Sequence, residues 1–146
     1  SSGTSYGINL DSDSSGACIH PSIKNNIIYH NGSSTNQYGI HENNPVTPDV
    51  IYNNDIYGFS VLYRDNNADN YSNISLINSL GTNYSGNIDM NVLFVDRASY
   101  NYALDSGNDN SIIQGALDLS STDGFSIDIN GTQRTDPWSM GAYEFD

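Results

Sequence analysis

The residues best suited to chemistry lie in one polar stretch near the middle of the chain. Tyr63, Arg64, Asp65 and Asp69 bring an aromatic ring, a guanidinium group and two carboxylates into a short segment. Such a ring can stack against a sugar, and the charged groups can bond its hydroxyls or hold a cation. These four are therefore the predicted ligand-binding residues, with an ordinary polar turn as the alternative.

A second stretch has the spacing of a calcium loop. In residues 11–16, Asp-Ser-Asp-Ser-Ser-Gly places oxygen-bearing side chains at the first, third and fifth loop positions and Gly at the sixth. The twelfth position is Ser22, where such loops carry a bidentate Glu. This partial match makes Asp11 and Asp13 the candidate metal ligands and calcium the candidate cofactor, with a solvated turn as the alternative.

Basic residues are too few for a clear catalytic site. Two of the four, Arg97 and Arg134, lie in C-terminal segments where we expect structural salt bridges. Lys24 and Arg64 remain, which are too few for a lyase site that needs a base and a group to neutralise a charged sugar. Among the acidic residues, no pair is distinguished by the spacing of a hydrolase site. Catalytic residues are therefore not identified, and the question of enzyme activity stays open.

The formal charge of −13 argues against two classes of partner. Seventeen acidic side chains against four basic ones repel the phosphates of nucleic acids and of anionic membrane surfaces. No apolar run is long enough for a membrane-spanning helix, so membrane insertion is not expected. Cys18 is the single cysteine, so no disulfide forms within the chain.

Three similar segments predict the fold. Residues 26–31, 49–54 and 73–78 each carry apolar or aromatic side chains at their second and fourth positions. Alternation is typical of a strand, and a strand that recurs at such intervals indicates a solenoid. The predicted fold class is all-β, a right-handed parallel β-helix. Its inward columns are expected to be Ile27, Val50 and Ile74, and Tyr29, Tyr52 and Leu76.

The last position of each segment is Asn. Asn tolerates the left-handed backbone of turns, and its amide can both donate and accept. We therefore predict that Asn31, Asn54 and Asn78 stack in an asparagine ladder.

A Tyr-Gly-apolar motif recurs at residues 6–8, 38–40 and 57–59. Each copy is predicted to form a short strand whose Gly marks a bend or a close approach of two backbones. The predicted organisation is β-helix coils over residues 1–85, continuing from an upstream segment, and the last coils with a C-terminal cap over residues 86–146.

Four C-terminal segments carry a family resemblance. They are residues 86–96, with Gly-Asn-Ile leading to Leu-Phe-Val-Asp, residues 102–107, with Tyr-Ala-Leu, residues 128–134, with Asp-Ile-Asn-Gly-Thr-Gln-Arg, and residues 140–144, with Gly-Ala-Tyr-Glu. In this order they resemble the C-terminal end of secreted bacterial and archaeal right-handed parallel β-helix proteins of pectate-lyase-like architecture. The resemblance implies a secreted or cell-surface protein.

Two departures from that family pattern stand out. Residues 110–115 lack the family's Pro and Asp, and Ser139 stands where the family has Asp. Both remove carboxylate contacts, while large apolar side chains remain to close the end of the core. These are Phe94, Leu104, Trp138 and Tyr143.

Two functions are compatible with these patterns. The first is an extracellular module that binds polysaccharide or helps to process it, which a row of exposed aromatic side chains would favour. The alternative is a non-enzymatic structural or filament protein, which an uncovered apolar N-terminal end would favour. At that end we expect contact with upstream coils or with another protein chain.

Overall fold

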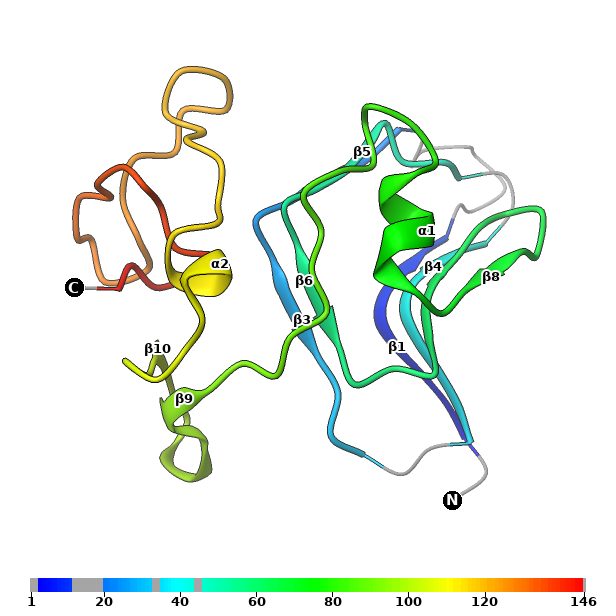
Figure 1. The fold of residues 1–146 in the computed structure, drawn as a ribbon, viewed down its shortest axis with the longest axis horizontal. Helices are drawn as coiled ribbons and strands as arrows, with labels where there is room; N and C mark the ends of the chain where they lie inside the picture. Colours follow the sequence, from blue (N-terminus) through cyan, green and yellow to red (C-terminus); the bar gives the residue numbers. More distant parts are fainter. Residues whose placement is uncertain (1–2, 12–19, 33–34, 44–45, 146) are drawn as a thin grey trace.

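The fold consists of short strands arranged in small sheets, with little helix (Figure 1). The structure is a computed structural model, and it describes residues 3–11, 20–32, 35–43 and 46–145. The elements are β1 (Thr4–Leu10), β2 (Ser22–Lys24), β3 (Ile27–Tyr29), β4 (Asn36–Glu42), β5 (Val50–Tyr52), β6 (Asp55–Tyr57), β7 (Val61–Arg64), β8 (Asn70–Tyr71), α1 (Ile74–Asn78), β9 (Phe94–Asp96), the 3-10 turn η1 (Arg97–Ser99), β10 (Asn101–Leu104) and α2 (Asn110–Ile113).

The largest sheet has the strand order β1-β4-β7-β8. Its first three strands are parallel, and β8 pairs antiparallel with β7. Two smaller parallel pairs, β2-β5 and β3-β6, lie beside it, and β9 and β10 form an antiparallel pair. Among the described residues, no helix is long and apolar enough to cross a membrane.

The predicted right-handed parallel β-helix is wrong for this structure. The described chain forms sheets of two to four strands that mix parallel and antiparallel pairing. The expected partners also lie apart: Ile27 pairs with Asp55, and Val50 pairs with Ser22. The first two repeated segments do contain strands, β3 and β5, but those strands belong to different sheets.

The predicted inward columns are also wrong. Ile28 and Ile51 are buried at the centres of β3 and β5. Ile27 and Val50, which precede them by one residue, are half-buried. Because side chains alternate along a strand, a phase error of one residue places every expected inward residue on the wrong face. In a three-residue strand the sequence pattern does not distinguish the two phases, because apolar residues flank the buried position.

The third repeated segment is a helix. Asn73 caps α1: its backbone is extended, and its side chain accepts a hydrogen bond from the Ser75 amide at 2.8 Å. Ile77 is fully buried, while Leu76, expected in a column, is 54% exposed. The alternation in residues 73–78 therefore coincides with an i, i+3 helical pattern in which Ile74 and Ile77 face the core.

A hydrogen-bonded chain of asparagine side chains crosses the interior, but its members differ from those predicted. The Asn26 amides donate to Oδ1 of Asn54 at 3.0 Å, and those of Asn54 donate to Oδ1 of Asn87 at 3.0 and 3.1 Å. The Asn87 amides donate in turn to Oδ1 of Asn78 at 3.0 and 3.1 Å. Asn31 is exposed and takes no part in this chain. The prediction therefore included two members, Asn54 and Asn78, but with the wrong neighbours.

Residues 86–145 build a second, smaller core. Val92, Leu104 and Ile112 are buried there, and half-buried side chains of β3 pack against them. The link to the first part runs through Ile88, which pairs with Asp55, the first residue of β6. Of the four residues expected to close the core, Leu104 and Trp138 are buried, whereas Phe94 and Tyr143 are half-buried.

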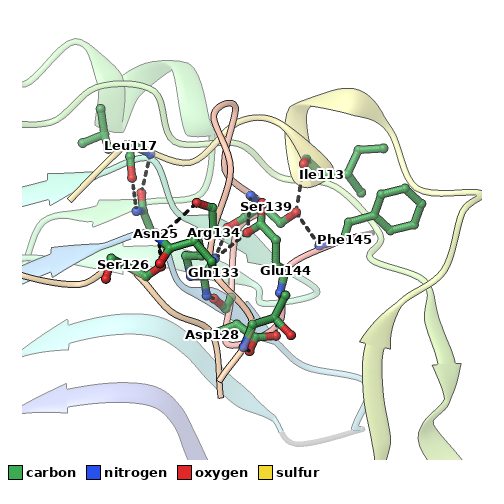
Figure 2. A network of polar contacts seen from close by, with 12 residues as sticks. Asn25, Ile113, Leu117, Ser126, Asp128, Gln133, Arg134, Ser139, Glu144 and Phe145 are labelled. Carbon is green, nitrogen blue, oxygen red and sulfur yellow. Dashed lines mark hydrogen bonds and ion pairs between the residues drawn. The ribbon is translucent and has the colours of Figure 1, made fainter. Parts of the chain in front are cut away.

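Figure 2 shows the polar network that holds the C-terminal segments together. Arg134 forms an ion pair with Glu144 at 3.0 Å and donates to the Ser139 and Gly141 carbonyls. The Ser139 hydroxyl donates to the Ile113 carbonyl at 2.9 Å and accepts from the Phe145 amide at 3.0 Å. Arg134 therefore has the structural role expected for it, and Ser139 is fully buried with its hydroxyl satisfied.

Candidate functional site

The recurring Tyr-Gly motif positions a cluster of rings on the four-stranded sheet. Tyr6 of β1 and Tyr38 of β4 are register partners on neighbouring parallel strands. A Cβ atom at Gly7 would lie 2.3 Å from Ile28, and one at Gly39 would lie 2.4 Å from Ile56. Gly at both positions therefore lets this sheet approach the β3-β6 pair and fixes the two tyrosines in register. The third motif is different, since Tyr57 ends β6 and stacks on Tyr29.

Four side chains form what we name the aromatic face: Tyr6, Tyr38, His41 and Arg64. The two tyrosine rings stack with centroids 5.7 Å apart and an interplanar angle of 18°. The His41 ring lies against both, at 4.9 Å from Tyr6 and 5.3 Å from Tyr38. Tyr6 stands on the edge strand of the sheet and is 44% exposed. The cluster thus presents flat apolar surface to solvent.

Arg64 completes the face. Its Cζ atom lies 5.5 Å from the centre of the Tyr38 ring, and its Nη1 donates to the Tyr38 hydroxyl at 3.1 Å. These two contacts hold the guanidinium plane beside the ring. They also leave further N–H donors of Arg64, which has five in all, for a ligand.

His41 contributes an acceptor of defined position. Its Nδ1 lies 2.8 Å from Oδ1 of Asn9, and because an amide oxygen can only accept, Nδ1 carries the proton. In that tautomer Nε2 is the ring nitrogen without a proton, and it is the one that can accept. Burial lowers the pKa of His41, the nearby Arg64 charge lowers it further, and Asp11 opposes both effects. The ring is therefore neutral at pH 7.

The four predicted ligand-binding residues do not converge on one surface. Tyr63 is 2% exposed and stacks on Tyr71 in the core, so a ligand cannot reach its ring. Asp65 instead orders its own turn, where its Oδ1 accepts from the amides of Asn67 and Asp69. Arg64 joins the aromatic face on the sheet.

A buried carboxylate explains why Tyr63 points inward. The Tyr63 hydroxyl donates to Oε1 of Glu42, and the Asn66 amide donates to Oε2 at 3.1 Å. Glu42 is 3% exposed, and burial raises its pKa while these two donors oppose the rise. Burial and Glu42 together raise the pKa of Tyr63 well above its ordinary value. This pair ties β4 to the turn after β7 and is structural.

The predicted calcium ligands are only partly described. Asp11 is exposed, and its Oδ1 accepts from the Asn43 side chain at 3.3 Å. Asp13 lies outside the described residues. Within the described ranges, no group of three or more His, Cys, Asp or Glu side chains is placed to hold a metal ion.

Three members of the aromatic face were missed as site residues. The Tyr-Gly motif was the available signal, because Tyr6 and Tyr38 hold the same position within it. His41 lies one residue beyond the second motif, and no sequence pattern distinguished it. No protein-family model, curated protein or solved structure compared with this chain gave a match.

Proposed function

We propose that this chain binds a neutral polysaccharide through the aromatic face. The observation that supports the proposal is the stacked pair Tyr6 and Tyr38 with His41 and Arg64 beside it. Sugar rings carry apolar C–H faces that pack on aromatic rings, and hydroxyls that pair with polar groups around them. Arg64 supplies donors and His41 an acceptor at the rim of the rings.

Charge favours a neutral ligand over an acidic one. The chain has a formal charge of −13, so its field opposes the approach of a polyanion. Arg64 already contacts the Tyr38 ring and donates to the Tyr38 hydroxyl. Its remaining N–H donors suit the hydroxyl groups of a neutral sugar. The four described residues of the aromatic face include no carboxylate, and we therefore propose binding without bond cleavage.

Calorimetric titration with soluble glucan, mannan, galactan and xylan, and with polygalacturonate as the acidic arm, tests this function. We expect at least one neutral polymer to bind, and Tyr6→Ala and Tyr38→Ala to weaken binding about tenfold or more, since each removes ring contact. Tyr100→Ala is the matched control because Tyr100 is 81% exposed and lies outside the face. Absence of binding by all neutral polymers, or equal losses in all three variants, contradicts the proposal.

A further inference from the structure

A second site lies between the two parts of the chain and shares no residue with the aromatic face. A cavity of about 660 Å³ opens between β3, the β9-β10 pair and residues 140–143. Figure 1 shows β3 and the β9-β10 pair on neighbouring parts of the fold. This volume falls within the range of small-molecule sites. We name it the hairpin groove.

Aromatic rings form one wall of the hairpin groove. Tyr29 meets Phe94 edge to face with centroids 6.2 Å apart, and Phe94 meets Tyr102 in the same way at 5.5 Å. Tyr57 stacks behind Tyr29 at 5.8 Å and supports it. Such edge-to-face pairs are favourable, so the wall is preformed. Ile27, Leu104 and Met140 add aliphatic lining.

One cation stands at this wall. The Cζ atom of Arg97 lies 5.2 Å from the centre of the Tyr29 ring. In the described part of the chain the ion pairs are His20–Asp49, Lys24–Asp123 and Arg134–Glu144, so Arg97 lacks the salt bridge expected from the sequence. Its guanidinium group is held over a ring and exposed to solvent.

The lining of the groove is unusual for so acidic a chain. The sequence has seventeen acidic residues, yet none of the residues lining the groove is Asp or Glu. Asn31 adds an amide to the lining. An adjoining hollow of about 420 Å³ shares Tyr29, Phe94 and Arg97 and includes Asp105, whose Oδ1 already accepts from the Gly107 amide. The groove thus combines apolar walls with one positive charge.

We propose that the hairpin groove binds a small organic anion in which an apolar ring carries one carboxylate. The ring packs among Tyr29, Phe94 and Tyr102, and the carboxylate accepts a bidentate pair of hydrogen bonds from Arg97. The Asn31 amide is the second donor available to that carboxylate. This site is independent of the polysaccharide proposed for the aromatic face.

Titration of the full chain with 2-naphthoate, and with 2-naphthamide as its neutral counterpart, tests this site. We expect naphthoate to bind with a Kd below about 1 mM and naphthamide about tenfold more weakly. Arg97→Gln should weaken naphthoate about tenfold or more while leaving naphthamide unchanged, and Arg97→Lys should restore part of the loss. Arg64→Gln is the matched control, since it removes a ring-stacked cation outside the groove.

Three results overturn the proposal. They are no saturable naphthoate binding, equal affinities for the acid and the amide, and naphthoate affinity that Arg97→Gln leaves unchanged. Tyr102→Ala keeps the test decisive if the Arg97 variants fail to fold, because Tyr102 is 41% exposed and its loss should weaken both probes. Failure here leaves polysaccharide binding intact, because the two sites share no residue.

Discussion

At the scale of single residues, Asp55 is the least satisfied group in the described structure. It is fully buried, its Oδ1 accepts from the Met90 amide at 2.9 Å, and its Oδ2 has no hydrogen-bond partner. Burial is the main cause that raises the pKa of Asp55 to about 7, with the Met90 donor opposing and the Asp89 charge adding to the rise. The folded protein therefore holds a proton that the unfolded chain releases near pH 4.

Because the folded state keeps this proton, we expect the free energy of unfolding to fall as pH rises. The stability from protonated Asp55 is fully present below the ordinary pKa of 3.8 and is lost as pH rises towards 7. Asp55→Asn stays neutral, so we expect it to be more stable than the wild type by roughly 2 to 4 kcal/mol at pH 8 and similar at pH 4. Urea unfolding at both pH values measures the difference. A variant no more stable than the wild type at pH 8 refutes this account of Asp55.

At the scale of elements, Gly7 and Gly39 of the first two Tyr-Gly motifs allow the sheets to pack closely. A Cβ at Gly39 would meet Ile56 at 2.4 Å and the Leu62 carbonyl oxygen at 2.5 Å. We expect Gly39→Ala to destabilise the fold by about 1 to 3 kcal/mol, because β4 must move away from its neighbours. Gly81→Ala is the control, since nothing lies within 4 Å of a Cβ there. Thermal unfolding compares them, and equal melting temperatures would refute the close approach.

The asparagine chain joins elements that are distant in sequence. Asn54 is fully buried, accepts from Asn26 and donates to both Asn87 and the Ile23 carbonyl. Asn54→Ala leaves several of these groups unpaired, and we expect a loss of roughly 2 to 4 kcal/mol. Asn31→Ala, at an exposed position, should change stability by less than about 0.5 kcal/mol. If Asn31→Ala and Asn54→Ala lose similar free energies of unfolding in denaturant, the result would favour the ladder predicted from the sequence over the chain of asparagines described here.

Short elements limited what the sequence could predict. Residues 27–29 and 50–52 form strands as expected, but their partners depend on long-range pairing that short local patterns do not encode. The helix at residues 74–78 begins after Asn73, a favourable N-cap residue whose signal the apparent repeat obscured. Tyr63 looked like a surface ring because its partner Glu42 lies on another strand.

At the scale of the whole molecule, two aromatic sites with one Arg each stand in a strongly acidic chain. The chain carries −13 overall, whereas the aromatic face and the hairpin groove each hold one Arg beside tyrosine rings. Ionic strength should therefore act differently on the two sites. Salt screens the attraction of Arg97 for a carboxylate but has little effect on ring stacking by a neutral sugar.

The aromatic face is the central claim, and NMR of its rings tests it most directly. Ring resonances of Tyr6, Tyr38 and His41 are followed while each neutral polysaccharide of the calorimetric panel is added. We predict that a binding polymer shifts these three rings together and leaves Tyr100 and Tyr102 in place. Shifts confined to other tyrosines, or no shift with any polymer, would contradict the assignment of polysaccharide binding to this face.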